Sequence, residues 1–510
     1  MLSGDNSILQ RATDAKTKSD EAQIRERIQL AYLSGLSGGK GSIDKGSFLL
    51  ELQKEFGAEK ATEDNIVESE DGKKWTVTID GVVVELVVGS TTTPTPQVAT
   101  LPSSKGTKPF LPSTAFSQVD GTDLSNGLVI TDHKTEGVSD GNEYVWIEVP
   151  NKNLAGEGTI SFTGPDYANT LPAEITGNLT DDQRTEIKRK LIAYVETLLN
   201  GSDCRTSRMG WRDEWYDSNN HIYDGTKWYK SDKSADTKYV EDISYSGNSE
   251  DTNGCGLNYI NYNTLYDNML KSVYNHGGFW IGRYEAGIEG SSTNISFARQ
   301  QASDRISSSS PKAVSKIDHI PYNWVYCSEA QTLASHVDNI DSAYNSSLMF
   351  GVQWDCVLKY LQGTGAVDES YITGNSSSWG NYKDSDNLFT VSRGKYAFWF
   401  PWGSSDLSSW KNIENDYTKQ AMAYPDVGYT VFSTGVTTRN MRKNIYDIAG
   451  NMYEWTLEHS TSYTDGDDYS CVRRGGGFVD ASSSNIPASE REEETISSAE
   501  KTIGFRVSIY

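Results

Sequence analysis

Three short motifs near the C-terminal end of the chain constrain its fold more than any other feature. Residues Tyr446–Trp455 place a Gly-Asn pair between an acidic residue and a Glu-Trp pair. An Arg-Gly-Gly sequence follows at Arg474–Gly476, and Gly504–Arg506, which reads Gly-Phe-Arg, comes shortly before the last residue. Globular folding in general requires none of these combinations in this order. They therefore indicate one particular kind of domain in this part of the chain.

The three motifs resemble, in type and order, those of the formylglycine-generating enzyme (sulfatase-modifying factor) family, whose catalytic domain has a C-type-lectin-like fold. Further family-like blocks occur upstream in the same order: Gly277–Glu285, Pro321–Trp324, Leu348–Asp355 and Phe400–Gly403. The resemblance covers most of residues 109–510, apart from an insert at about residues 151–272. It implies an α+β, C-type-lectin-like domain with a large insert.

The family's oxidase activity depends on two cysteines that follow the Arg-Gly-Gly strand and together bind copper, since reduced thiolates are soft ligands that suit Cu(I). Alignment on Arg474–Gly476 places Asp480 at the first of these positions and Asn485 at the second. A carboxylate and an amide can neither form a copper dithiolate nor pass through a disulfide. No cysteine follows Cys471. The resemblance therefore implies a catalytically degenerate relative that binds no copper and is not an enzyme of this type.

A second feature of the family is retained. Asp447, the carbonyl groups of Gly450 and Met452, and Glu454 match the positions that hold a structural Ca²⁺ in the family. A tight loop of this kind can turn several oxygens toward one hard cation, which prefers oxygen ligands. The resemblance therefore implies a calcium site. The alternative is that the two carboxylates only cap turns.

The five cysteines show no ordered pattern. They contain no Cys-x-x-Cys pair, and an odd number cannot all pair within one chain. Cys327 and Cys356 stand in apolar, helix-like contexts typical of small buried side chains, and Cys204 and Cys255 are a possible disulfide pair. Cys471 is expected to stand alone. The spacing of the cysteines and six histidines predicts no zinc or histidine metal centre.

Length and charge limit the possible functions. A chain of 510 residues exceeds one ordinary core, so two or three domains are expected. The net charge of −24 disfavours nucleic acid and anionic membrane surfaces as partners, because both would repel the chain. No run of about twenty apolar residues is present, so the sequence predicts no membrane span.

The first part of the chain has its own organisation. A charged helical segment is expected up to about Ser34, and a second helix from Asp44 to Phe56. Two β-rich runs, Trp75–Ile79 and Val82–Val88, flank an Asp-Gly pair, which predicts a hairpin. Residues 1–88 thus resemble a type IV pilin-like module whose preceding hydrophobic helix is missing here, so a membrane is expected as partner only through that helix. An ordinary amphipathic surface helix is the alternative.

Two other segments separate the recognisable parts. Residues 89–108 are rich in Ser, Thr and Pro and are expected to form a linker. Within the insert, a capping-box spacing from Thr180 to Gln183 predicts a helix over Asp181–Leu199. An aromatic-rich stretch follows it, with Trp211 and Trp228 as candidate ligand contacts. The alternative is that these aromatic residues form the core of the insert.

These observations favour a non-catalytic binding or adhesion module, displayed on the surface of a bacterium by a pilin-like stalk. In related display proteins, ligand contacts lie between the Arg-Gly-Gly and Gly-Phe-Arg strands, which here is Val479–Thr502. The expected ligand is a glycan or a surface protein, with pilus subunits as further possible partners. An iron-dependent oxidase and a purely structural pilus subunit are the alternatives. The candidate contact residues in this segment are Asp480, Ser482, Ser484, Asn485, Glu490 and Glu492.

Overall fold

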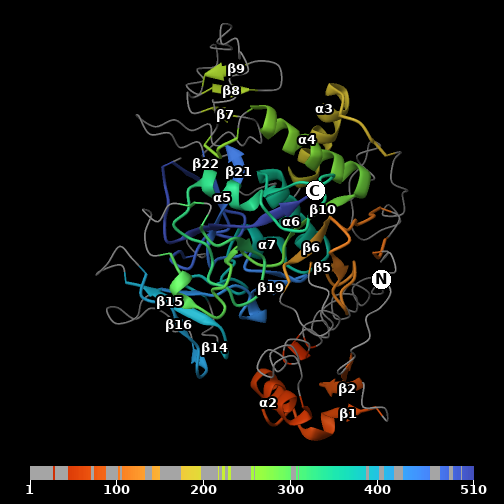
Figure 1. The fold of residues 1–510 in the computed structure, drawn as a ribbon, viewed down its shortest axis with the longest axis vertical. Coiled ribbons are helices and arrows are strands. Elements are labelled where there is room, and N and C mark those ends of the chain that lie inside the picture. The colour runs from red at the N-terminus through yellow and green to blue at the C-terminus, as the bar shows by residue number, and fades with distance from the viewer. Residues whose placement is uncertain are drawn as a thin grey trace, which may run out of the picture. The chain divides into compact units, whose positions relative to one another are not determined.

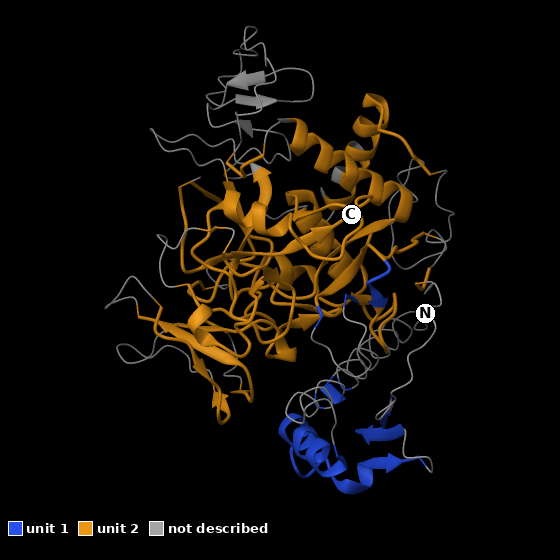
Figure 2. Ribbon diagram, in the orientation of Figure 1, with its two compact units in different colours: residues 1–100, 114–117, 131–141 blue, residues 101–113, 118–130, 142–510 orange. Residues whose placement is uncertain are grey.

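The fold is described from a computed structural model of the 510-residue chain (Figure 1). The structure describes residues 44–69, 74–87, 101–103, 106–132, 141–149, 174–196, 254–257, 259–299, 306–307, 309–385, 390–400, 407–418, 429–459, 471–481, 486–495 and 497–510, together with 24, 27, 28, 31, 216–217, 221–223 and 228–230. Two compact units divide the chain (Figure 2). The smaller comprises residues 1–100, 114–117 and 131–141, and the larger comprises the rest.

The smaller unit contains one described helix of appreciable length and a small antiparallel sheet. Helix α2 (Lys45–Phe56) begins after Asp44, whose side chain accepts a hydrogen bond from the Ser47 amide. The sheet has the order β1-β2-β3, from Ile66–Glu68, Lys74–Ile79 and Val82–Val87. Phe48 of α2 stacks on Trp75 of β2 with ring centroids 5.3 Å apart. Apolar faces of helix and sheet thus form the core of this unit.

The smaller unit contains the helix and the hairpin that the sequence predicts. The helix predicted from Asp44 to Phe56 and the hairpin closed by Asp80 and Gly81 are both confirmed. Asp80 and Gly81 have positive φ values of 47° and 82°, as a two-residue hairpin turn requires. Of the helical segment predicted before Ser34, residues 24, 27, 28 and 31 are helical, and the others lie outside the described residues.

The larger unit is built around an antiparallel sheet covered by helices (Figure 1). Trp280 of β10 lies opposite Trp146 of β6, and their ring centroids are 4.9 Å apart. The helices α3 (Asp181–Glu196), α4 (Tyr259–His276) and α6 (Gly351–Gly363) pack beside it, with α4 against β10 and α6 against β6. The sheet order is β13 (Ser346–Leu348), β25 (Val507–Ile509), β10 (Gly278–Gly282), β6 (Glu143–Glu148), β5 (Val129–Thr131) and β4 (Ser117–Gln118).

Each of the three diagnostic motifs contributes residues to a strand of a second sheet. Its order is β23 (Arg491–Glu494), β22 (Cys471–Arg474), β21 (Tyr453–His459) and β24 (Ile503–Phe505). Strands β21 and β22 are antiparallel, whereas β21 and β24 are parallel. The pairing aligns Glu454 with both Arg474 and Gly504. Motifs far apart in the sequence therefore meet across one strand.

Shorter elements complete the described part of the chain. Helix α5 spans Cys327–Ala334, and α7 (Glu369–Thr373) follows α6. Three short 3-10 helices are η1 (Glu63–Asn65), η4 (Ile295–Phe297) and η5 (Thr438–Asn440). The remaining strands are β7 (Tyr216–Asp217), β8 (His221–Tyr223), β9 (Trp228–Lys230), β11 (Gly287–Ile288), β12 (Ala313–Val314), β14 (Thr390–Val391), β15 (Lys395–Trp399), β16 (Lys411–Asn412), β17 (Tyr417–Thr418), β18 (Tyr429–Phe432), β19 (Met441–Arg442) and β20 (Ile445–Tyr446).

The capping box predicted for the insert is confirmed at α3. The Thr180 amide donates to the Gln183 side chain at 3.0 Å, and the Gln183 amide donates to the Thr180 hydroxyl at 3.2 Å. The helix is described from Asp181 to Glu196. The mixture of helices and mainly antiparallel sheets in the larger unit agrees with the α+β class expected from the sequence.

Candidate functional site

Asn451, in the Gly-Asn pair of the first motif, connects several segments of the larger unit. Its side-chain oxygen accepts hydrogen bonds from the Asn381 side chain at 2.9 Å and the Phe432 amide at 3.1 Å. Its side-chain nitrogen donates to Glu285 at 2.6 Å. The amide of Met452 donates to the other oxygen of Glu285 at 2.9 Å. A buried amide side chain satisfied in this way fixes the local fold, which explains why the motif contains asparagine.

The Glu-Trp pair and the Gly-Phe-Arg motif meet as a buried ion pair. The Arg506 guanidinium donates from Nη2 to Glu454 at 2.6 Å, and neither side chain is more than 1% exposed. Arg506 also donates to the carbonyl groups of Gly282 at 3.0 Å and Tyr446 at 2.8 Å. The arginine is therefore fully engaged by protein groups, as a buried charge must be.

Two further carboxylates lie in the same buried region. Asp447 accepts hydrogen bonds from the Asn440 side chain and the Gly435 amide, each at 3.0 Å. Burial raises the pKa of Asp447 and of Glu454. Burial, reinforced by the charges of Asp447 and Glu454, raises the pKa of Glu285 well above its ordinary value. Three carboxyl groups thus lie near one guanidinium, and their raised pKa values reflect the cost of burying several negative charges together.

The residues predicted to hold calcium are close together in the chain, and some of them already form hydrogen bonds with other protein groups. Asp447 and Glu454 are buried and already accept hydrogen bonds from protein donors. Gly450 has a φ of 71°, and a Cβ there would lie 2.6 Å from the Asn381 carbonyl oxygen, so this position requires glycine. Met452 follows in the same turn, with its amide bound to Glu285. The calcium site at these four residues stays a prediction.

A closed ring of four charged side chains supports the Arg-Gly-Gly motif. Arg474 contacts Asp355 at 2.8 Å and Glu458 at 3.1 Å. Arg491 contacts the other oxygen of Asp355 at 3.0 Å and also contacts Glu458. None of the four side chains is more than 2% exposed. The ring, hereafter the Arg474–Arg491 ring, joins β21, β22, β23 and α6.

Asp480 is the candidate contact residue that the structure describes in most detail. Its carboxylate accepts a hydrogen bond from the Gly477 amide at 2.9 Å, which closes a turn directly after the Arg-Gly-Gly motif. Burial raises the pKa of Asp480 to about 6. The charge of Glu492 lies close enough to add to this shift, and Arg473 opposes it. Arg473 pairs with Glu492 at 3.2 Å and lies 4.2 Å from the Tyr453 ring centroid.

The other candidate contacts are placed only in part. Glu490 and Glu492 are half-buried, and the Glu490 carbonyl accepts a hydrogen bond from Arg474 at 2.8 Å. Trp228 belongs to β9 and pairs with Tyr223 of β8. The structure therefore brings Asp480 and Glu492 together. Ser482, Ser484, Asn485 and Trp211 lie outside the described residues.

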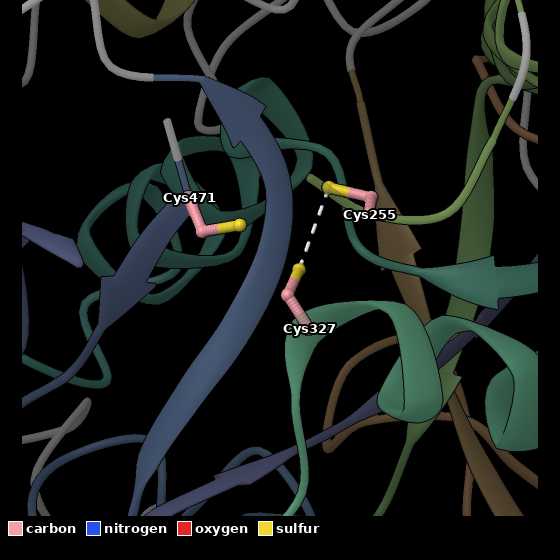
Figure 3. Close-up of side chains that lie close together, drawn as sticks. All are labelled: Cys255, Cys327 and Cys471. Carbon is pink, nitrogen blue, oxygen red and sulfur yellow. Dashed lines mark hydrogen bonds between the residues drawn. The ribbon is translucent and has the colours of Figure 1, made fainter. Parts of the chain in front are cut away.

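Three cysteines form a cluster that the sequence did not indicate (Figure 3). The sulfur atoms of Cys255, Cys327 and Cys471 all lie within 4.8 Å of one another, and all three residues are buried. Cys255 lies in the turn before α4, Cys327 is the first residue of α5, and Cys471 is the first residue of β22. Thiols in this arrangement can bind a soft metal ion or exchange protons.

The sulfur atoms interact with one another and with a strand. Cys327 Sγ lies 3.4 Å from Cys255 Sγ, and the Thr456 carbonyl oxygen lies 3.7 Å and 3.8 Å from these two sulfurs. Hydrogen bonds from Cys327 and Cys471 lower the pKa of Cys255 to about 5, although burial acts against this. Burial raises the pKa of Cys327 well above its ordinary value. The neighbouring thiols therefore favour the thiolate form at Cys255 over that at Cys327.

This cluster corrects the expectation that Cys471 stands alone. Cys471 begins a strand beside β21, and this pairing carries its sulfur toward two residues that are remote in the sequence. Cys327 is buried as predicted, but it contacts other sulfurs in addition to apolar neighbours. Cys356 is buried, as predicted. Cys255 lies against Cys327, and its possible partner Cys204 lies outside the described residues. Spacing along the chain carried no signal for a grouping that depends on tertiary contacts.

Comparison with known proteins supports the family resemblance for the larger unit. Residues 277–509 match the sulfatase-modifying factor enzyme 1-like domain, so this part of the chain contains a domain of that kind. The matched stretch includes all three motifs, the Arg474–Arg491 ring and two of the three clustered cysteines.

Other comparisons add little. Among solved structures, Treponema denticola variable protein 1 is 13% identical, with 46% of this chain and 84% of that chain covered and a TM-score of 0.24. At this TM-score the likeness supports no argument about fold or function. No curated protein matches the chain. Within the described residues, no helix is long and apolar enough to span a membrane.

Proposed function

We propose that this chain is a non-catalytic binding module whose ligand contacts lie in residues 479–502. The observation that carries this proposal is the environment of Asp480. At the position where the family resemblance places the first copper-binding cysteine, the half-buried carboxylate of Asp480 closes a turn by accepting a hydrogen bond from the Gly477 amide. This residue supports the backbone where the family would have its reactive thiol.

The anchoring of the segment agrees with a role in display. Arg474 precedes it and Arg491 lies within it, the two residues are cross-strand partners, and both belong to the same buried ring. The chain between them leaves and re-enters the sheet at one fixed point. Binding residues are commonly carried by loops that a rigid scaffold positions. Substitutions in this loop can therefore change a ligand contact without disturbing the sheet below.

The ligand class follows from the chemistry of the segment and of the insert. The proposed ligand is a glycan or a surface protein, because polar loop residues and aromatic faces together recognise both. The proposed location is the outer surface of a bacterium, with the pilin-like module as a stalk and with pilus subunits as possible further partners. A structural Ca²⁺ at Asp447, Gly450, Met452 and Glu454 would hold the turn at the base of β21.

The test is a screen of the full chain against glycan arrays and cell-surface proteins. Binding of any ligand found in this way is then measured for variants of the chain. Replacing Ser482, Ser484 and Asn485 together by Ala should abolish a hit, and Trp228→Ala should weaken it by about 2 kcal/mol or more if Trp228 is a hot spot. Glu68→Gln, at an exposed carboxylate on β1, is the control and should leave binding unchanged. Binding that survives the triple replacement would remove residues 479–502 from the site and refute the proposal.

The absence of oxidase activity can be tested separately. The copper-loaded chain should not oxidise the cysteine of a sulfatase peptide, because Asp480 and Asn485 occupy the positions of the two copper-binding cysteines in the family. Peptide conversion is followed by mass spectrometry. Turnover that disappears in Cys471→Ala would contradict the proposal and would indicate an enzyme that uses the remaining thiols.

A further inference from the structure

We propose that Cys255, Cys327 and Cys471 form a buried binding site for a single Cu(I) ion, held by the three cysteine sulfurs. This site is distinct from the position at which the sulfatase-modifying factor family holds copper. That position falls at Asp480 and Asn485 here, after the Arg-Gly-Gly motif, whereas the three cysteines come from the turn before α4, from α5 and from the start of β22.

The spacing of the sulfurs suits a three-coordinate ion. Three sulfurs that each lie about 2.3 Å from a central ion, the bond length of metal thiolates, are about 4 Å apart when the ion lies in their plane. Here the separation of Cys255 and Cys327 is 3.4 Å, and all separations are within 4.8 Å. Shifts of about half an ångström per sulfur, which side-chain rotation supplies, would therefore close the site around an ion.

The ligand set favours Cu(I) over zinc. Sulfur ligands select soft ions, which include both. Zinc prefers four ligands and completes a three-residue site with water. In the described part of the chain, no further His, Cys, Asp or Glu joins the cluster, and the cysteines are 0%, 1% and 0% exposed, so the sulfurs are shielded from bulk water. Cu(I) is satisfied by three soft ligands and needs no water.

The position of the three cysteines in the fold is compatible with metal binding. Each sulfur would bind the ion as a thiolate and would lose its proton as the ion binds. Because the three sulfurs belong to a turn, a helix and a strand, an ion would cross-link β22 to α5 and to the chain entering α4 (Figure 3). Strand β22 ends at Arg474, so this cross-link lies at the opposite end of the strand from the Arg474–Arg491 ring.

The experiment uses the full chain, reduced and freed of metal under anaerobic conditions. It is titrated into a Cu(I)–bicinchoninate complex, whose colour is lost when the protein withdraws the ion. The unmodified chain should withdraw one Cu(I), and X-ray absorption of the product should show only sulfur neighbours at the bond length of copper thiolates. Cys327→Ser and Cys471→Ser should each abolish the withdrawal, whereas Cys356→Ala and Cys204→Ala should preserve it.

Several results would overturn the proposal. They are no withdrawal by the unmodified chain, withdrawal unchanged in Cys327→Ser or Cys471→Ser, and nitrogen or oxygen neighbours in the absorption spectrum. Tighter binding of Zn²⁺ than of Cu(I) in a competition would equally refute it. So would a Cys255–Cys327 disulfide found by mass spectrometry in protein purified without oxygen, because it would leave one thiol only. The absorption measurement needs no variant, so a folding defect in the Ser variants does not prevent a decision.

Discussion

At the scale of single residues, the unusual feature of the larger unit is the number of buried carboxylates that retain protein partners. Asp480 differs from these in being half-buried; its carboxylate accepts a hydrogen bond from the Gly477 amide and lies close to the charges of Arg473 and Glu492. The carboxylate is partly sheltered from water, and its charged form is therefore less favourable than in the unfolded chain. Stability should then depend on pH at this residue.

Asp480→Asn should become relatively more stable than the unmodified chain as the pH rises. Burial raises the pKa of Asp480 to about 6, compared with about 3.9 in an unfolded chain. A raised pKa of an acid gives a stabilising contribution that is complete below about pH 4 and is lost as the pH passes about 6. Asparagine avoids this loss, so the advantage of the variant should grow by at most about 3 kcal/mol between pH 4 and pH 7.5.

Urea unfolding followed by tryptophan fluorescence across this pH range measures the effect. Asp416→Asn, at an exposed carboxylate, is the matched control and should show a constant difference from the unmodified chain. A difference between Asp480→Asn and the unmodified chain that does not change with pH would mean that Asp480 is not the half-buried acid described here.

The second residue-scale prediction concerns calcium. Asp447, Glu454 and Glu285 lie in a buried region with one arginine, Arg506, and a divalent cation bound there would stabilise the charged form of these carboxyl groups. Chelation should lower the melting temperature, and added Ca²⁺ should restore it. At a Ca²⁺ concentration one hundred times the dissociation constant, the free energy of unfolding should rise by about 2.7 kcal/mol. Asp447→Asn should lose this response. If a chelator does not change the melting temperature of the unmodified chain, the prediction of a structural calcium site is wrong.

At the scale of elements, the Arg474–Arg491 ring decides how the motif-bearing sheet is fixed. Two arginines on β22 and β23 alternate with carboxylates on α6 and β21, and their alternation leaves no charge without a partner of opposite sign. A buried ring of this kind is weak evidence of high stability, because desolvating the four charges costs almost as much as their attraction returns. Its main consequence is that removing any one of the four side chains leaves a buried charge without its partner and destabilises the fold.

Asp355→Asn should therefore destabilise the larger unit by about 3–5 kcal/mol, because it leaves two buried guanidinium groups facing one carboxylate. The matched control is Asp338→Asn, which breaks the exposed pair with Lys312, whose nitrogen and oxygen are 2.6 Å apart. That change should cost about 1 kcal/mol or less, since exposed pairs are screened by water. Chemical denaturation of both variants gives the comparison. Equal losses of stability in the two variants would show that the ring contributes no more to stability than an exposed ion pair does.

The same elements show what the sequence could and could not predict. The hairpin around Asp80 and Gly81 and the capping box at Thr180 are encoded within a few neighbouring residues, so local patterns were sufficient. The motifs indicated the positions of Arg474 and Arg506, but not the ion pairs that these arginines form. Their partners Asp355 and Glu454 come from other elements. The cysteine cluster was missed for the same reason, because β22 must pair with β21 before Cys471 meets Cys327.

At the scale of the whole molecule, the chain consists of two units with separate cores. Residues 89–108, where the chain first passes from the smaller unit to the larger, are rich in Ser, Thr and Pro, which is typical of an extended linker. The larger unit is firmly anchored from Thr107 onward. Thr107 is buried, its hydroxyl accepts a hydrogen bond from the Trp146 indole at 2.8 Å, and the Lys108 amide donates to the His276 carbonyl at 2.8 Å.

Limited proteolysis should therefore cut the chain first between residues 91 and 100. Proteinase K suits this test because the segment 88–104 contains no lysine or arginine for trypsin. A protease needs several residues of extended backbone, which the Pro- and Thr-rich sequence provides and which the hydrogen-bonded backbone after Thr107 does not. Two fragments should accumulate, and N-terminal sequencing of the larger one should begin before Thr107. Resistance of this segment under conditions that cut elsewhere in the chain would show that residues 91–100 are packed against a folded unit and do not act as a linker.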